Sequence, residues 1–214
     1  MRVLGAARMG TQQMATPPST STALPGLPEP PDARAELLEL LRRQSFRRGK
    51  FVLASGKESD FFIDCKQTVL GARGHLLAGT VMFDCLDRLP RCEAVAGVAL
   101  GGCPLASALS VVSELRGRPL PALYVRKETK DHGTRRLVEG DSALGSGAPV
   151  VLLEDVITTG GSTLKAVAAL GASGAKVVGV VVLVDRREGG TEALDAAAMP
   201  WVSVFRRQDF IPDE

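Results

Sequence analysis

Aromatic side chains are scarce in this chain of 214 residues: Phe, Tyr and Trp make up 4%, with one Trp and one Tyr. Proteins that bind single-stranded nucleic acid stack its bases on aromatic rings, so the scarcity argues against that function. The chain also lacks an excess of charge, since 26 Lys and Arg face 24 Asp and Glu. A formal charge of +2 gives it little overall attraction to nucleic acid or to an anionic membrane.

Long apolar runs are absent as well, because none approaches the roughly 20 residues that span a bilayer or forms a secretory signal. The cysteines Cys65, Cys85, Cys92 and Cys103 have no CxxC spacing, which argues against a zinc knuckle or a thioredoxin-type pair. They lie in or beside apolar segments, and we expect buried free thiols rather than disulfides. These absences favour a soluble cytoplasmic protein with neither nucleic-acid nor membrane partners.

The first 32 residues differ in composition from the rest of the chain. They contain six of the 13 prolines and a Ser/Thr run at residues 19–22. Such a segment buries too little apolar surface to offset its ordering entropy, so we predict a disordered tail at residues 1–32 and one domain at residues 33–214. Because Met9 and Met14 lie within this segment, a later start codon is an alternative.

From Ala33 onward the apolar residues become periodic. Four short apolar runs have the length of buried strands: residues 94–99, 121–126, 150–155 and 177–185. Helical patterns cover a stretch from Ala33 that ends before Gly49, and residues 71–89, 105–115 and 162–170. Residues 51–54 and 61–65 flank a polar turn and predict a hairpin. Alternation of buried strands with helices predicts a doubly wound α/β domain with a mostly parallel sheet, and the hairpin as an added flap.

The most informative stretch is residues 150–163, where a buried strand leads directly into two carboxylates, Glu154 and Asp155. A short loop of hydroxyls and glycines follows before a helix begins. Ligands of open α/β sheets collect at the carboxyl ends of strands, and amides at a helix N-terminus form an anion site. The hydroxyls that can add donors are Thr158, Thr159, Ser162 and Thr163.

The two carboxylates suit ribose hydroxyls, a cation such as Mg²⁺, or a developing positive charge. A dinucleotide-binding motif would place its glycines before the acid, and no P-loop is present. The alternative is an ordinary glycine-containing turn with a serine N-cap.

Two further loops have the composition of binding loops. Residues 97–104 place a Gly-Gly pair after a strand, where an anion can approach the backbone amides, although a plain turn is the alternative. Residues 126–138 are rich in cations, with Gly133 as a hinge, and predict a lid that closes over an anionic substrate. A solvated charged hairpin is the alternative. His132 lies in this polar loop, where it can donate a hydrogen bond or a proton, whereas His75 is expected to be structural.

An arginine at the end of a strand is suited to an anionic ligand. Arg186 can pair bidentately with a carboxylate, and Arg187 competes for this role, because alternation along a strand lets only one of them point inward.

Several of these segments resemble one enzyme family. Residues 154–163 are similar to the phosphoribosyl diphosphate (PRPP) motif of type I phosphoribosyltransferases. Residues 55–64, 126–133 and 185–188 resemble the corresponding motifs of the orotate phosphoribosyltransferase branch. The resemblance implies the type I phosphoribosyltransferase fold and transfer of phosphoribosyl from PRPP to orotate, which gives orotidine 5′-monophosphate and diphosphate with Mg²⁺ as cofactor. It also implies a homodimer whose lid loop reaches the partner's site, and a non-proline cis peptide within residues 97–104.

The resemblance also assigns roles to individual residues. The catalytic residues it implies are Lys130, His132 and Asp155. Those implied to bind PRPP or diphosphate are Arg126, Lys127, Lys130, His132, Glu154, Asp155, Val156, Ile157, Thr158, Thr159, Gly160, Gly161 and Ser162. Those implied to bind orotate are Phe61, Phe62, Thr158 and Arg186, for which the motif favours Arg186 over Arg187. Mg²⁺ is expected to be held mainly by PRPP, with Asp155 as the one protein ligand considered.

Two positions depart from the family pattern. Ala54 and Gly101 stand where some members have a lysine, and Lys57 is a candidate to compensate for the first. Two other functions are considered: a phosphoribosyltransferase for another base, which would not need Arg186, and a PRPP-sensing regulator. A regulator of this kind usually carries a basic nucleic-acid-binding module, for which residues 1–32 have neither the charge nor the periodicity. No decarboxylase domain fits in the remaining length, so we expect the product to pass to a separate protein.

Overall fold

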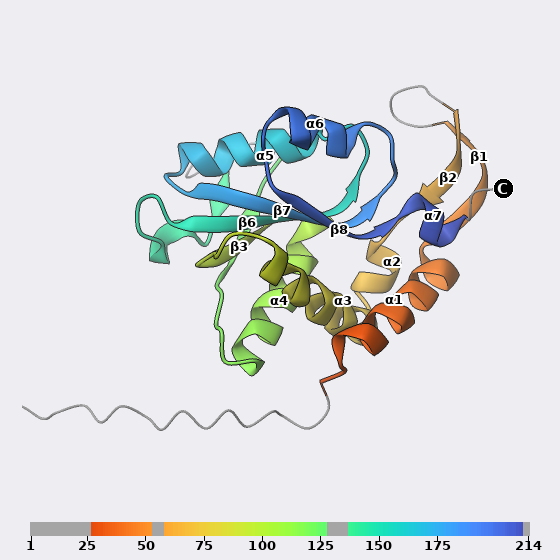
Figure 1. The fold of residues 1–214 in the computed structure, drawn as a ribbon, viewed down its shortest axis with the longest axis horizontal. Coiled ribbons are helices and arrows are strands. Elements are labelled where there is room, and N and C mark those ends of the chain that lie inside the picture. Colours follow the sequence, from red (N-terminus) through yellow and green to blue (C-terminus); the bar gives the residue numbers. More distant parts are fainter. Residues whose placement is uncertain (1–26, 53–57, 128–136, 212–214) are drawn as a thin grey trace, which may run out of the picture.

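The computed structural model describes residues 27–52, 58–127 and 137–211. In this part of the chain a six-stranded sheet forms the centre of the fold, and a two-stranded hairpin lies beside it (Figure 1). In order across the sheet the strands are β5 (Val138–Glu139), β4 (Ala122–Val125), β3 (Ala94–Val98), β6 (Pro149–Ile157), β7 (Lys176–Asp185) and β8 (Trp201–Arg206). All neighbours pair in parallel except β4 and β5, which pair antiparallel.

Helices cover both faces of this sheet (Figure 1). On one face lie α1 (Pro30–Gln44), α3 (Ala72–Cys85) and α4 (Gly102–Leu115); on the other lie α5 (Gly161–Ala172) and α6 (Gly190–Ala196). Successive residues of β6 alternate between the two cores, since Val151 and Leu153 pack on the first face and Val150 and Leu152 on the second. The predicted α/β domain with a mostly parallel sheet is confirmed.

The hairpin consists of β1 (Phe46–Val52) and β2 (Glu58–Ile63), paired antiparallel, and α2 (Lys66–Val69) follows it. Phe61 is fully buried and packs on Phe46 at a ring-centroid distance of 5.1 Å. Phe210 of the last helix, α7 (Arg207–Phe210), lies 5.6 Å from each of these two rings. The aromatic cluster therefore fixes the hairpin to the C-terminal end of the domain.

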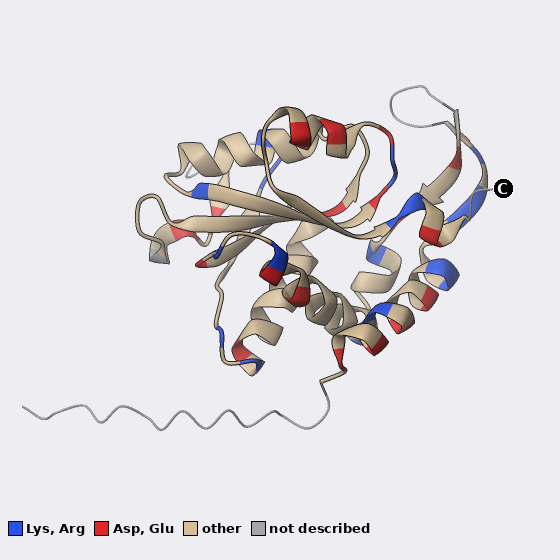
Figure 2. Cartoon of the chain, in the orientation of Figure 1, with Lys and Arg blue, Asp and Glu red and all other residues tan. Residues whose placement is uncertain are grey.

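Lys and Arg residues occur along this hairpin and at the adjoining ends of α1 and α7 (Figure 2). Asp60 of β2 accepts two hydrogen bonds from Arg207, at 2.8 and 3.0 Å, which adds a polar link to the aromatic one. The hairpin thus brings basic residues next to the sheet.

The structure corrects the boundaries of several predicted elements. The hairpin begins at Phe46 rather than at residue 51, because Phe46 packs against Phe61 and Phe210, which no local pattern reveals. The helix expected from Ala33 begins at Pro30, since proline is well tolerated in a first turn. The strand expected at residues 150–155 continues to Ile157. The elements β5, β8, α6 and α7 were not predicted.

Residues 1–26 of the predicted tail lie outside the described part of the chain. Within that part, no helix is long and apolar enough to cross a membrane. All four cysteines are free, as predicted; three of them are buried and Cys103 is partly buried.

Candidate functional site

The loop between β6 and α5 forms the centre of the candidate site. Thr158 and Thr159 separate the strand from Gly160, which precedes the helix with a φ of 77°. A side chain at Gly160 would be strained by this φ, and its Cβ would lie 2.9 Å from the carbonyl oxygen of Gly190. The turn can therefore be made only by glycine, and it presents the free amides of the α5 N-terminus at the carboxyl edge of the sheet.

Glu154 and Asp155 point to opposite sides of β6, as neighbouring strand residues must. Glu154 faces α5, where it is 5% exposed and its Oε2 accepts a hydrogen bond of 2.8 Å from the Thr163 hydroxyl. Burial raises the pKa of Glu154 to about 7; the Thr163 hydrogen bond opposes this shift and the charge of Asp155 adds to it.

Thr163 thereby has a different role from the predicted one. Its side chain is fully buried and its hydroxyl is committed to Glu154. The expectation that Thr163 adds a donor for a bound anion is wrong, because this third residue of α5 faces β6.

Asp155 faces the loop that follows β3. A Cβ added to Gly101 would lie 1.9 Å from Asp155 Oδ2, so the backbone of this loop lies directly against the carboxylate. Burial raises the pKa of Asp155, and a hydrogen bond from the Val156 amide and the charge of Lys66 oppose the shift. The peptide bond between Ala99 and Leu100 is cis, which confirms the expectation for this loop. Two predicted anion-binding loops therefore meet at one carboxylate.

The described part of the cationic loop begins beside the same site. The Arg126 Nε lies 2.8 Å from Glu139 Oε1, and the Arg126 amide donates to the carbonyl oxygen of Leu137 at 2.8 Å. Lys127 is exposed, and its charge opposes the upward shift of the Glu154 pKa. The predicted catalytic residues Lys130 and His132 lie outside the described residues, as do Ala54 and Lys57.

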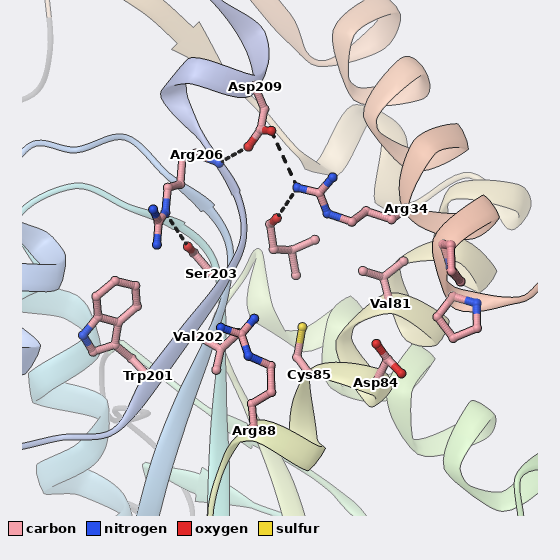
Figure 3. Close-up of a pocket in the computed structure, with 13 residues that line it drawn as sticks. Arg34, Val81, Asp84, Cys85, Arg88, Trp201, Val202, Ser203, Arg206 and Asp209 are labelled. Atoms are coloured by element: carbon pink, nitrogen blue, oxygen red, sulfur yellow. Dashed lines mark hydrogen bonds and ion pairs between the residues drawn. The ribbon is translucent and has the colours of Figure 1, made fainter.

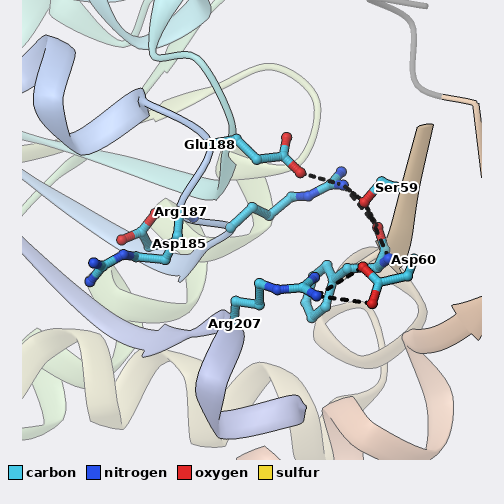
Figure 4. Close-up of polar contacts among 8 residues, drawn as sticks. Ser59, Asp60, Asp185, Arg187, Glu188 and Arg207 are labelled. Atoms are coloured by element: carbon cyan, nitrogen blue, oxygen red, sulfur yellow. Dashed lines mark hydrogen bonds and ion pairs between the residues drawn. The ribbon is translucent and has the colours of Figure 1, made fainter. Parts of the chain in front are cut away.

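Arg186 comes to the site from the end of β7. Its amide donates to the carbonyl oxygen of Ile157 at 3.2 Å, which places it beside the β6–α5 loop. Its guanidinium is 7% exposed and donates to the Phe61 carbonyl oxygen at 2.8 Å and to the Ser59 hydroxyl at 3.1 Å. Glu188 pairs with the same nitrogen at 2.8 Å (Figure 4). The buried Nε has no hydrogen-bond partner in the described part of the chain.

Arg187 is exposed and points away from Arg186. Its φ is 59°, and its amide donates to Asp185 Oδ1 at 2.8 Å, which stabilises this turn. Figure 4 shows Arg187 beside Asp185 and directed away from Ser59, the residue to which Arg186 donates a hydrogen bond. The prediction that only one of the two arginines points inward, and that it is Arg186, agrees with this geometry.

The two predicted phenylalanines differ in exposure. The Phe61 ring is buried under Arg186, whose guanidinium carbon lies 5.6 Å from the ring centroid. Phe62 is 41% exposed, and its ring centroid lies 5.3 Å from that of Phe51. Phe61 is thus placed to position Arg186, and Phe62 is the one with ring surface open to a ligand.

A cavity of about 420 Å³ adjoins Arg186 and is bordered by Lys50 and Ser59 of the hairpin and by Glu188. A second cavity, of about 790 Å³, lies between α1, α3 and β8, where Arg34, Cys85 and Trp201 border it (Figure 3). None of the residues predicted for the site lines this second cavity. Cavity size alone would therefore indicate a different part of the fold from the one that the sequence motifs indicate.

The sequence did not reveal Ser59, Lys66 and Glu188, which lie near predicted site residues. It also did not reveal that the Thr163 hydroxyl donates to Glu154. Ser59 and Glu188 both contact Arg186. Both also lie inside segments that resemble family motifs, residues 55–64 and 185–188, and this position was the available signal for them. Lys66 had no such signal, because only the fold brings α2 to Asp155.

Comparison with known proteins gives the class first: the phosphoribosyl transferase domain family matches residues 88–208. The chain is 68% identical over 180 residues to the orotate phosphoribosyltransferase of Sorangium cellulosum, covering 84% of this chain and 94% of that protein. Its fold is similar to a crystal structure of Mycobacterium tuberculosis orotate phosphoribosyltransferase in complex with Fe(III) dicitrate. That match has a TM-score of 0.71 and 38% identity, over 84% of this chain and 99% of the other.

A second structure of the Mycobacterium tuberculosis enzyme is a complex with PRPP. It has a TM-score of 0.68 and 36% identity, and the match covers 83% of this chain and 98% of that chain. The chain belongs to the orotate phosphoribosyltransferase family.

Proposed function

We propose that the protein transfers the 5-phosphoribosyl group from PRPP to orotate, giving orotidine 5′-monophosphate and diphosphate in pyrimidine biosynthesis. Family membership supports this reaction, and the position of Arg186 supports the substrate. A buried guanidinium whose Nε lacks a partner among the described residues is unfavourable by itself, and the carboxylate of orotate would relieve it. This single observation favours a nucleobase that carries a carboxylate over an uncharged nucleobase.

Displacement of diphosphate from the anomeric carbon determines what the site must supply. A ring nitrogen of orotate forms the new bond to that carbon as the bond to the diphosphate oxygen breaks. Positive charge develops on the ribose and negative charge on the leaving group. We expect the amides of the β6–α5 turn and of the first residues of α5, residues 158–162, to bind the phosphate of PRPP, together with the hydroxyls of Thr158 and Thr159. Asp155 is placed for the ribose end, next to the loop at residues 97–104 that would hold the diphosphate.

Mg²⁺ is part of the proposal because diphosphate groups bind it in solution and at enzyme sites. Asp155 is one carboxylate, and no group of three or more potential metal ligands occurs among the described residues. This donor set fits a metal held mainly by the substrate, with Asp155 as the protein ligand. When bound, Mg²⁺ neutralises part of the charge of the diphosphate.

Lys130 and His132 complete the proposal, because the leaving diphosphate requires cations from a lid. Arg126 and Lys127 begin that loop at the candidate site. We infer a homodimer in which the loop reaches the partner's site. Exposed apolar side chains on the α4 side, Leu100 and Val111, are consistent with a second copy. We expect the enzyme to work in the cytoplasm, where its free cysteines stay reduced.

Release of diphosphate tests the base specificity. The purified protein is mixed with PRPP, Mg²⁺ and, separately, orotate, uracil or a purine base. Orotate alone should support release. Release of diphosphate with uracil or a purine but not with orotate would show that the protein uses another base. PRPP binding without release of diphosphate for any base would favour a regulator.

A further inference from the structure

The loop at residues 97–104 has no cation of its own, although the diphosphate it would hold is highly charged. Gly101 occupies the place where some relatives of this fold have a lysine, and its backbone lies against Asp155. Asp155 itself would repel the diphosphate. A cation from another element on this side of β6 would add to the positive charge of the lid.

The start of α2 lies at this position. Cys65 is fully buried, and its Sγ lies 3.9 Å from the backbone carbonyl oxygen of Asp155, so the residues before α2 abut the end of β6. Lys66 is the first residue of α2, and its side chain is 37% exposed. Figure 1 shows α2 between the hairpin and α3, on the face of the sheet that carries α4.

Lys66 directly follows Cys65, whose Sγ lies 3.9 Å from the Asp155 carbonyl oxygen, so its charge and that of Asp155 influence each other. Hydrogen bonding to Asp64 raises the pKa of Lys66, and the charge of Asp155 adds to this shift. The charge of Lys66 in turn counters the effect of burial on the Asp155 pKa. Lys66 is thus a partly exposed cation that enters α2 beside the end of β6.

Lys66 is held in a way that allows it to change partner. Its Nζ lies 2.5 Å from Asp64 Oδ1, and that carboxylate is also bound by Gln67. A partly exposed ion pair of this kind contributes little to stability, whereas a charge-assisted bond to a phosphate oxygen is stronger. Exchange of Asp64 for an oxygen of the ligand therefore costs little.

We propose that Lys66 binds the diphosphate group of PRPP, supplying the positive charge that Gly101 leaves out of the adjoining loop. This role rests on the proposed function, since it assigns a further residue to the same substrate. Lys66 then binds a ligand in addition to forming the first residue of α2.

Calorimetric titration with inorganic diphosphate and with PRPP, both with Mg²⁺, tests the proposal. Loss of one charge-assisted bond predicts that Lys66→Ala weakens both ligands about tenfold, while Lys66→Arg restores most of the affinity. The KM for orotate should change less than that for PRPP. Lys176→Ala is the matched control, because Lys176 is exposed at the amino end of β7, at the opposite edge of the sheet.

Asp64→Asn separates binding from a structural role of the ion pair. Lys66 is retained and unpaired in that variant, so diphosphate affinity should be unchanged or higher. Equal losses in Asp64→Asn and Lys66→Ala, or an affinity of Lys66→Ala equal to that of Lys176→Ala, would overturn the proposal. Failure of the wild type to turn over orotate would instead refute the proposed function. The two failures are distinguishable because calorimetry measures diphosphate affinity without turnover.

Discussion

Arg186 donates a hydrogen bond of 2.8 Å to the backbone carbonyl oxygen of Phe61, which joins the end of β7 to the hairpin. The two residues are 125 positions apart in the chain, yet the bond is buried. It fixes a guanidinium beside the β6–α5 turn, so the hairpin, the end of β7 and this turn form one framework.

Arg186→Lys should impair orotate binding in particular. Lysine keeps the charge but loses the planar fork, so we expect the KM for orotate to rise about tenfold or more with a smaller change in the KM for PRPP. Steady-state kinetics with each substrate varied measures the two effects. The matched variant Arg187→Lys should leave both KM values nearly unchanged, because Arg187 is exposed and points away. Equal effects of the two substitutions would show that Arg186 has no special role.

Glu154 should make the stability of the protein depend on pH. Its pKa is raised from 4.5 to about 7 by burial, so the folded state holds a proton that the unfolded state releases. The stabilising effect of the neutral acid is present below pH 4.5 and is lost as the pH rises to about 7. Glu154→Gln keeps a neutral acceptor for Thr163, and its stability relative to the wild type should rise by on the order of 3 kcal/mol across that window.

Urea unfolding at pH 5 and pH 8 measures this difference. Glu114→Gln serves as the control, because Glu114 is exposed on α4 and its substitution should give the same difference from the wild type at both values. A Glu154→Gln difference that does not change with pH would show that the pKa of Glu154 is not raised in the folded state.

Gly160→Ala should destabilise the anion-binding turn. Alanine at a φ of 77° is strained, and its Cβ would lie 2.9 Å from the Gly190 carbonyl oxygen. We expect a loss of about 1–2 kcal/mol in the free energy of unfolding, together with weaker PRPP binding. Gly161→Ala is the matched comparison for stability, since nothing lies within 4 Å of a Cβ there. Similar stabilities of the two variants would contradict the requirement for glycine at position 160.

Lys130→Ala should lower kcat by about two orders of magnitude while leaving the circular dichroism spectrum unchanged, because the leaving diphosphate loses a cation. Mixing it with Asp155→Asn tests the shared site. If the loop acts on the partner's site, a mixed dimer contains one site with both residues intact and recovers part of the activity. Absence of any recovery in subunits shown to exchange would place the loop over its own site.

The class of the fold and the edge of the sheet that carries the site could be predicted from the sequence, because both depend on local patterns. Buried apolar runs alternating with helices lead to the parallel sheet, and Glu154 and Asp155 at the end of one run lead to its carboxyl edge. Strand alternation also predicts that only one of Arg186 and Arg187 is buried.

The partners of these residues could not be predicted, because they come from distant parts of the chain. Thr163 is nine positions from Glu154, and its hydroxyl could equally have faced a ligand. Phe46 begins the hairpin earlier than expected because it packs on Phe210, and β8 escaped notice because an edge strand with exposed polar positions has a weak pattern. Lys66 comes near the end of β6 only through the packing of α2.

The central claim is tested most directly by following the absorbance of orotate when the protein, PRPP and Mg²⁺ are combined, with the product identified by mass spectrometry. The account predicts loss of orotate absorbance and formation of one orotidine 5′-monophosphate for each diphosphate released. Unchanged orotate in a preparation that binds PRPP would contradict it.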